Sequence, residues 1–218
     1  MPRARSKKSG NRRRTSSRGI LFVVSAPSGA GKTTLVVNLL RRDRRLVRTV
    51  SHTTRAPRAV EKNGQDYSFV SCARFEKMIR QKAFLEWAKA YGDRYGTSRQ
   101  AVEKPLRAGK DLVLVIESHG GRAIRRLFPD AVLILVLPPD LATLRKRLRG
   151  REKDRSSLAR RIRVAQSEVR SLRGYDYLVI NDRVAEGVRQ LEAIVSAERR
   201  KISRNEEVIG RFLRKTTV

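Results

Sequence analysis

The sequence contains very few cysteines and no long apolar run, and both shortages narrow what the chain can be. Its 218 residues include a single cysteine, Cys72, so an internal disulfide framework is excluded and a reducing compartment is indicated. No apolar run approaches the roughly 18 residues that a membrane-spanning helix requires. The first residues also lack the apolar stretch of a secretory signal. We therefore expect a cytoplasmic protein without a membrane segment.

Acidic and aromatic residues are scarce as well. The chain has 21 Asp and Glu against 51 Lys and Arg, which gives a formal net charge of +30, and only 6% of its residues are aromatic. Such a charge favours polyanions as partners. Because the cations are spread along the chain and few aromatic side chains could stack on bases, we favour a solvated basic surface around polyanionic substrates over nucleic-acid binding.

The first 18 residues hold eight Lys and Arg, no acid and almost no apolar side chain. A segment of this composition cannot bury enough apolar surface to fold. We expect residues 1–18 to be a disordered basic tail that binds polyanions weakly and without specificity. The segment lacks the apolar face that an organelle transit helix would need.

An apolar run followed by a glycine-rich loop is the most informative feature that is present. Residues 20–34 read ILFVVSAPSGAGKTT, and five successive apolar residues are typical of a strand buried on both faces of a parallel sheet. The loop nearly fits the phosphate-binding (P-loop) pattern of Gly, four residues and Gly-Lys-Ser/Thr, with Ala26 in place of the first Gly. A helix is predicted over Thr33–Arg42.

Such a loop turns successive backbone N–H groups toward phosphate oxygens at a helix N-terminus. Lys32 would reach the β- and γ-phosphates, and the Thr33 hydroxyl would hold Mg²⁺. The residues expected to bind the nucleoside triphosphate are Ser25, Ala26, Pro27, Ser28, Gly29, Ala30, Gly31, Lys32, Thr33 and Thr34.

Strands alternate with helices through much of the remaining chain, which predicts an α/β fold with a parallel sheet covered by helices on both faces. The further strands of this core are expected at Leu46–Ser51, Leu112–Ile116, Ala131–Leu137 and Tyr177–Ile180. Its further helices are expected at Arg122–Leu127, Leu141–Arg149, about Leu158–Arg173 and from about Val184. The charged segment Gly150–Ser157 has no large apolar residue and is predicted to be a mobile loop.

The amino-acid composition changes between Ser51 and Thr97, where the chain is polar, rich in turn-forming residues and contains scattered aromatic residues. Short strands at Tyr67–Val70 and Phe84–Ala88 would flank a helix over Ser71–Gln81, which indicates an inserted subdomain. Thr97 and Gln100 have capping-box spacing, so the next core helix is predicted to begin there and to end near Gly109.

This inserted segment also carries residues suited to a second substrate. Arg55 and Arg58 could clamp a phosphate together with the phenols of Tyr67 and Tyr95. The carboxylate of Glu86 could accept from the ring N–H and exocyclic amine that guanine presents.

The motifs SAPSGAGKT, SHTTRAPR, NGQDY, FLEWA, YGTS, LRGR and VIND occur in the order and near the spacing of the guanylate kinase family, and the chain resembles its bacterial form from about Gly19 to Lys201. The resemblance implies transfer of a phosphoryl group from ATP to GMP or dGMP with Mg²⁺. It also implies a P-loop core (19–50, 98–149 and 158–203), an inserted GMP-binding subdomain (51–97) and a small mobile lid (150–157), followed by a basic C-terminal tail (204–218).

The resemblance assigns roles residue by residue. Arg55, Arg58, Tyr67 and Tyr95 would hold the GMP phosphate, and Ser51, Glu86 and Thr97 would read the guanine. The catalytic cations would be Lys32, Arg147, Arg151 and Arg161, and Asn181 would lie beside the adenine of ATP.

The chain departs from the family at the end of the strand Leu112–Ile116. Val115 stands where the family has an acid near the Mg²⁺, and Glu117 stands where it has the Asp that helps to read guanine. Alternate strand residues share a face, so we hypothesise that Glu117 covers part of the missing role. His119 replaces a Gln and, beside a glycine pair, is interpreted as a turn residue.

Three other functions fit parts of the pattern. A ribose bisphosphate phosphokinase shares the core but needs no guanine reader such as Glu86. A non-catalytic guanylate-kinase-like module that binds phosphopeptides tends to lack the cations that Lys32, Arg147 and Arg151 supply. A P-loop protein that mainly binds nucleic acid would suit the charge of +30.

Overall fold

A parallel five-stranded sheet forms the centre of the molecule, in the strand order β2-β7-β1-β8-β9. The computed structural model describes residues 18–90, 92–116, 118–149, 158–159, 162–163, 165–166 and 174–214. The strands of this sheet are β1 (Leu21–Ser25), β2 (Leu46–Arg48), β7 (Asp111–Ile116), β8 (Val132–Leu137) and β9 (Tyr177–Ile180). The predicted α/β class and parallel core are therefore confirmed.

Helices cover both faces of this sheet because its central strands carry apolar side chains on both sides. Every residue of β1 is buried. On one face β1 packs against α1 (Lys32–Arg42) and α7 (Val184–Arg199), and on the other against α3 (Arg99–Arg107) and α4 (Ser118–Leu127). A third apolar cluster lies on α5 (Leu141–Arg149).

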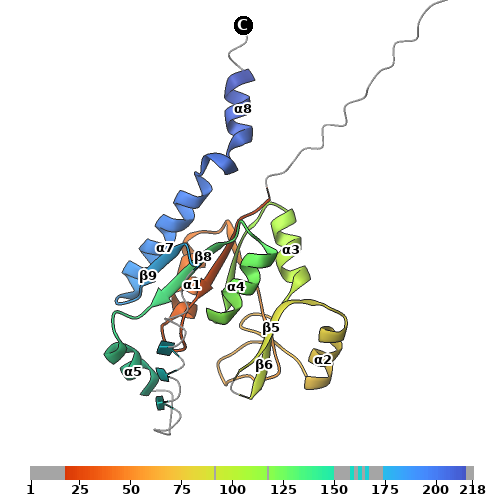
Figure 1. The fold of residues 1–218 in the computed structure, drawn as a ribbon, viewed down its shortest axis with the longest axis vertical. Coiled ribbons are helices and arrows are strands. Elements are labelled where there is room, and N and C mark those ends of the chain that lie inside the picture. Colours follow the sequence, from red (N-terminus) through yellow and green to blue (C-terminus); the bar gives the residue numbers. More distant parts are fainter. Residues whose placement is uncertain are drawn as a thin grey trace, which may run out of the picture.

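A second sheet of four strands lies beside this core, on the far side from α5 (Figure 1). It has the order β4-β3-β6-β5 and consists of β3 (His52–Thr53), β4 (Ser68–Phe69), β5 (Phe84–Ala90) and β6 (Asp93–Ser98). Helix α2 (Cys72–Arg80) covers one face, where the Phe75 and Phe84 rings stack 4.5 Å apart. A Cβ at Gly96 would lie 2.9 Å from the Phe84 ring, so this position requires glycine.

Several predicted boundaries were wrong. The strand expected over Leu46–Ser51 ends at Arg48, and a separate strand, β3, follows it. Thr97 lies inside β6 rather than at a helix start, because the N-cap of α3 is Ser98. Helix α4 begins at Ser118, so His119 lies in a helix and not in a turn. A Cβ at position 121 would lie 2.7 Å from the Tyr175 hydroxyl, so the close approach of Tyr175 to α4 favours glycine there.

The C-terminal residues form more structure than a tail. After α7 come a 3₁₀ turn (Ile202–Arg204) and a helix, α8 (Glu206–Arg214), which extends away from the core (Figure 1). The apolar side chains of α8 are exposed, with Phe212 73% accessible. No helix among the described residues has the length and apolarity to cross a membrane.

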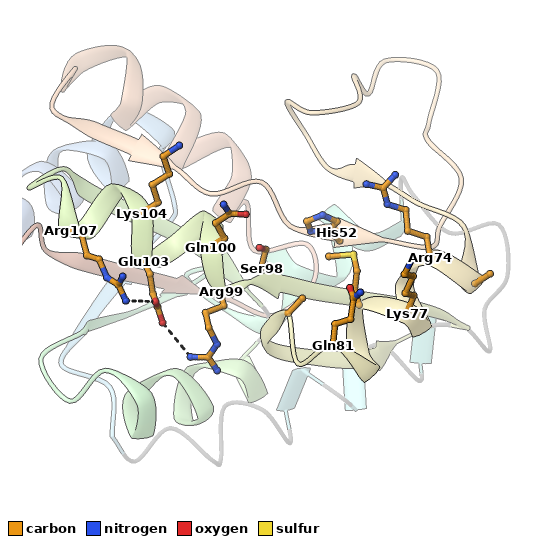
Figure 2. A pocket seen from close by; sticks show the side chains of 13 residues that line it. His52, Arg74, Lys77, Gln81, Ser98, Arg99, Gln100, Glu103, Lys104 and Arg107 are labelled. Carbon is orange, nitrogen blue, oxygen red and sulfur yellow. Dashed lines mark hydrogen bonds and ion pairs between the residues drawn. The ribbon is translucent and has the colours of Figure 1, made fainter.

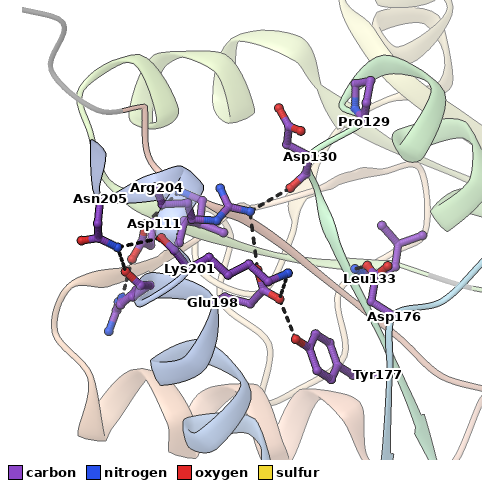
Figure 3. Close-up of polar contacts among 12 residues, drawn as sticks. Asp111, Pro129, Asp130, Leu133, Asp176, Tyr177, Glu198, Lys201, Arg204 and Asn205 are labelled. Carbon is purple, nitrogen blue, oxygen red and sulfur yellow. Dashed lines mark hydrogen bonds and ion pairs between the residues drawn. The ribbon is translucent and has the colours of Figure 1, made fainter. Parts of the chain in front are cut away.

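Glu198 is buried near the end of α7 and anchors it. Its carboxylate accepts from the Tyr177 hydroxyl at 2.6 Å and pairs with Lys201 and Arg204 (Figure 3). Burial raises the Glu198 pKa, but the hydrogen bonds from Lys201 and Tyr177 outweigh it and leave that pKa below its ordinary value. The bond to Glu198, together with burial, raises the pKa of Tyr177 to about 12.

Three expectations fall mainly outside the described residues. They are the disordered tail, of which only Arg18 is described, the lid at 150–157, and most of the helix expected over Leu158–Arg173.

Removing the phenol of Tyr177 should weaken this anchor. A hydrogen bond to a charged group contributes about 2 kcal/mol, so Tyr177→Phe should lower the unfolding free energy by about that amount and Tm by roughly 5 °C. Thermal and urea unfolding would measure both. The neighbouring Leu178 is 56% exposed, so Leu178→Ala serves as the matched control and should change stability little. Equal stability of Tyr177→Phe and the unmodified chain would contradict the assignment.

Candidate active site

The loop between β1 and α1 has the geometry of a phosphate-binding loop. Gly29 and Gly31 have φ of +87° and +90°, a region that residues with a Cβ rarely adopt. Gly31 is the N-cap of α1, so the loop leads directly into a helix N-terminus, where anions are favoured. The Lys32 ammonium donates to the Ala26 carbonyl at 3.2 Å, which folds the side chain back over the loop.

Asn181 holds this loop from the end of β9. Its Nδ2 donates to the Ala30 carbonyl at 2.7 Å, and the side chain is buried. A Cβ on Gly31 would approach that Nδ2 to 2.3 Å. Only glycine at position 31 therefore allows the amide to reach the loop. The backbone N–H of Asn181 is itself fixed by a 2.7 Å bond to the Leu137 carbonyl at the end of β8.

Arg147 of α5 lies against the same corner of the molecule, where Asn181 and Asp182 at the end of β9 meet the loop. Its Nη2 donates to the carbonyls of Asn181 and Asp182 at 2.9 and 3.3 Å. Its Nη1 is buried and finds no hydrogen-bond partner among the described residues, and the same holds for Ser25 Oγ and Asn181 Oδ1. Buried polar atoms are normally paired, so this corner offers donors and acceptors to a ligand.

A second pair of cations, Arg55 and Arg58, lies in the segment between β3 and β4. The Arg55 guanidinium donates to both oxygens of Glu61 at 2.8 and 2.9 Å, and its Nη1 donates to the Ala56 carbonyl at 2.7 Å. It also lies over the rings of Tyr67 and Phe69, at 5.7 and 5.8 Å. Arg55 is therefore held in one orientation, with a bidentate partner that a phosphate could replace or share.

Two phenols complete this cluster. Tyr67 and Tyr95 pack edge to face with ring centroids 6.0 Å apart. Arg58 is exposed, and its backbone N–H donates to Glu61 at 2.8 Å. Burial raises the pKa of Glu61, but hydrogen bonds from Arg58 and Arg55 outweigh it, so the pKa is lowered and the carboxylate stays ionised at neutral pH.

Glu86 and Thr97 form a separate pair on the neighbouring strands. The Thr97 hydroxyl donates to Glu86 Oε1 at 2.6 Å, across paired positions of β5 and β6. Burial raises the pKa of Glu86, and the bond from Thr97 offsets only part of that rise. A partly buried carboxylate with one oxygen already satisfied has its other oxygen available for ligand N–H groups.

The predicted residues thus fall into two groups. The loop residues, Arg147 and Asn181 meet at one corner. The other group belongs to the small sheet: Glu86, Tyr95 and Thr97 lie on β5 and β6, Arg55, Arg58 and Tyr67 lie between β3 and β4, and Ser51 is half-buried just before β3. Three predicted site residues, Glu117, Arg151 and Arg161, lie outside the described residues.

The structure identifies two features that the sequence patterns missed. The sequence patterns did not identify Glu61, although it orients Arg55 and contacts Arg58. Its position six and three residues after these arginines could have indicated the contacts. Asn181 contacts the loop backbone directly, a role that only the three-dimensional arrangement reveals.

Metal ligands are few in this part of the molecule. Within the described ranges, no three acidic, histidine or cysteine side chains cluster in a way that could hold a metal. Thr33 is exposed in the first turn of α1. Val115 packs against the apolar cluster between the sheet, α1 and α7, so no carboxylate occupies its position.

Comparisons with known proteins agree with this geometry. The family model for guanylate kinase matches residues 18–198. The chain is 46% identical to the guanylate kinase of Polaromonas sp. (strain JS666), over 85% of this chain and 90% of that protein. It is 48% identical to the guanylate kinase of Anaeromyxobacter dehalogenans, over 83% and 81% respectively. The crystal structure of guanylate kinase from Anaplasma phagocytophilum superimposes with a TM-score of 0.72 at 30% identity, covering 86% of this chain and 90% of that one.

Truncating Asn181 should lower the stability of the fold and, in addition, weaken binding at the loop that Asn181 contacts. Asn181→Ala leaves the Ala30 carbonyl buried and unpaired, which costs about 2 kcal/mol of unfolding free energy. It should also raise KM for the nucleoside triphosphate several-fold more than KM for the second substrate. Steady-state kinetics and urea unfolding would measure these effects.

Asn205 is a suitable control because its amide also donates to backbone carbonyls, those of Arg199 and Lys201. Asn205→Ala should lower stability without changing either KM. Equal changes in the two KM values of Asn181→Ala would contradict a specific effect on the loop.

Proposed function

This chain belongs to the guanylate kinase family, and from that premise we propose that it transfers the γ-phosphoryl group of ATP to GMP or dGMP, forming ADP and GDP or dGDP. The observation that carries the proposal is the pairing of two sites in one chain. A phosphate-binding loop with its lysine is present, and so is a carboxylate–hydroxyl pair suited to guanine, beside an arginine–tyrosine cluster suited to a phosphate.

In the donor half, Lys32 and the loop N–H groups would bind the β- and γ-phosphates of ATP. Phosphoryl transfer requires mainly positioning and positive charge around the equatorial oxygens. Arg147 supplies one cation already fixed by backbone carbonyls, and we assign Arg151 and Arg161 to the same task by family position. Closure of the segment 150–157 over both substrates would exclude water as the acceptor.

The described residues fit Mg²⁺ bound mainly by substrate. Mg²⁺ typically keeps several waters and takes few protein ligands beside substrate phosphates. Thr33 would supply a hydroxyl, because it lies exposed in the first turn of the helix that the loop enters. When bound, the ion would neutralise charge on the β- and γ-phosphate oxygens. Since Val115 cannot act near the ion, we propose that Glu117 covers part of that role.

In the acceptor half, Arg55, Arg58, Tyr67 and Tyr95 would hold the GMP phosphate. The stacked rings and the Glu61 carboxylate keep Arg55 from rotating, which reduces the entropy lost on binding. Glu86, with Ser51 and Thr97, would read the guanine edge, and Glu117 would add a second carboxylate.

We also propose that the GMP-binding subdomain spans residues 51–97 and the lid residues 150–157, that the protein is cytoplasmic, and that the basic tail binds polyanions weakly. No observation favours the ribose bisphosphate phosphokinase, the non-catalytic module or the nucleic-acid-binding protein as the main function.

A coupled ADP-release assay with a panel of acceptors tests the proposed reaction. With ATP and Mg²⁺, we expect turnover with GMP and dGMP and none above background with AMP, UMP or ribose bisphosphate. Lys32→Ala should abolish the signal, which would exclude a contaminating kinase. Preference for ribose bisphosphate would overturn the proposal.

Glu86 should make GMP binding pH-dependent. Because burial raises its pKa, the carboxylate is protonated at a higher pH than an exposed glutamate, whose pKa is near 4.5. KM for GMP should therefore rise as the pH falls through this raised pKa. In Glu86→Gln, KM should be about 10- to 100-fold higher and independent of pH over that range, since a charged hydrogen-bond acceptor is lost.

Glu76 provides the control, because it pairs with Arg94 on the outside of the small sheet. Glu76→Gln should keep the KM and pH profile of the unmodified chain. A Glu86→Gln profile that still bends at the same pH would show that another group titrates.

A further inference from the structure

The side chain of Arg48 joins the parallel core to the segment that carries Tyr67. Arg48 is the last residue of β2, the edge strand of the core, where it pairs with Val113 of β7. Its Nη2 donates to the backbone carbonyl of Asp66 at 3.3 Å. Asp66 directly precedes Tyr67, so this contact lies one residue from a phenol that we assign to the GMP phosphate.

The chain around Asp66 folds on itself and forms a compact turn, Lys62–Tyr67. The Asp66 N–H donates to the Lys62 carbonyl at 3.0 Å, and the Lys62 N–H donates back to the Asp66 carboxylate at 2.9 Å. The Gly64 N–H donates to the Tyr67 carbonyl at 2.8 Å. Because these bonds tie the turn together, a displacement of the Asp66 carbonyl would also displace Tyr67.

The backbone of Arg48 is fixed in the parallel core, so its side chain starts from a rigid position. The next residue, Thr49, is buried, and its N–H and hydroxyl both donate to the Val113 carbonyl, at 3.1 and 3.4 Å. Leu46 shares a face of β2 with Arg48 and is buried in the apolar cluster that includes residues of α1 and α7. Arg48 therefore connects a well-packed strand to the turn.

The Arg48 guanidinium is half-buried and has few partners. It forms no ion pair with any residue that the structure describes, and its buried Nε finds no hydrogen-bond acceptor there. The carbonyl of Asp66 accepts from this charged group. A hydrogen bond from a charged donor is roughly twice as strong as one between neutral groups, so this contact can hold the turn.

The position of the Tyr67 ring matters for the whole acceptor cluster. The ring packs against Tyr95 with centroids 6.0 Å apart, and the Arg55 guanidinium lies 5.7 Å from its centre. Groups that bind a substrate phosphate together must be held to within about 0.5 Å of their working positions. A shift of the turn would therefore weaken binding of the phosphate even if every cluster residue were still present.

Other cations near the small sheet do not contact this turn. Figure 2 shows Arg74 and Lys77 on one side, and Lys104 and Arg107 on the other, of a groove of about 1240 Å³ between α2 and α3. Among the described residues that line this groove, none belongs to Lys62–Tyr67. Its exposed cations therefore provide charge-matched controls for Arg48.

We propose that Arg48 is a positioning residue for the acceptor site, and that it holds Tyr67 in place through the Asp66 carbonyl. This inference rests on the proposed transfer to GMP, and it adds a residue of the parallel core to the acceptor half. Arg48 acts through Tyr67 and not on the substrate itself. Its loss impairs binding of the GMP phosphate and leaves the donor site intact.

Steady-state kinetics of Arg48→Met test this proposal, because methionine keeps an apolar stem but removes every donor. KM for GMP should rise roughly three- to tenfold, while KM for ATP and kcat stay unchanged. Arg48→Lys retains a charged donor and should recover most of the loss. The control Arg74→Met removes the same side chain from the groove and should leave all three parameters unchanged.

A double-mutant cycle with Tyr67→Phe identifies the route of the effect. If Arg48 acts through the Tyr67 phenol, Arg48→Met combined with Tyr67→Phe should have the same KM for GMP as Tyr67→Phe alone. Thermal unfolding verifies that each variant is folded. If Arg48→Met does not fold, Arg48→Gln takes its place with the same expectations.

GMP turnover by the unmodified chain separates this inference from the proposed function. Where GMP is turned over, the role of Arg48 alone is overturned by any of four results: an unchanged KM for GMP in Arg48→Met, equal rises of both KM values, an equal effect of Arg74→Met, or KM increases that multiply in the double variant. Absence of GMP turnover would overturn the proposed function and this inference with it.

Discussion

The donor site depends on the hydrogen bond between the Asn181 amide and the Ala30 carbonyl. Through it, the end of β9 fixes a loop that starts two strands away, at the end of β1. Arg147 then takes its position from the carbonyl of the same asparagine. One residue therefore sets the distance between Arg147, which we propose to be catalytic, and the glycine-rich loop, and the absence of a Cβ at Gly31 is what allows this contact.

The strand register of the small sheet determines which side chains share each of its two faces. Its Tyr95 and Thr97 face carries the groups suited to a nucleoside monophosphate, while its His52 and Gly96 face is covered by α2. Because side chains alternate along a strand, the packing of α2 on one face does not compete with the polar groups on the other.

Sequence patterns predicted the features that depend on local order along the chain. The β1–loop–α1 unit and the buried strand β8 follow from apolar runs and glycine spacing. Strand β6 was missed because Asp93–Ser98 has no apolar alternation; it pairs with β5 and β3, and Gly96 is required by the stacked rings of Phe75 and Phe84. Helix α4 starts earlier than predicted, at Ser118, although it contains Gly121, whose helix propensity is low; at that position a Cβ would collide with Tyr175. The Asn181–Ala30 contact joins residues 151 positions apart and depends on tertiary proximity, which no local pattern encodes. Glu61 contacts arginines only three and six residues away, but within an irregular segment that has no helix or strand period.

The strand order has a consequence for how the chain folds as it is synthesised. Ile20 and Asp111, which join the starts of β1 and β7, are 91 residues apart, and both sheet neighbours of β1 are made late. The small sheet pairs only within residues 52–98, so it can form while the apolar β1 still lacks partners. Long-range parallel pairing is slow and leaves strands exposed. The apolar segment Leu21–Ser25 therefore stays unpaired until β7 and β8 have been synthesised, and it is a site of aggregation risk in the nascent chain during that interval.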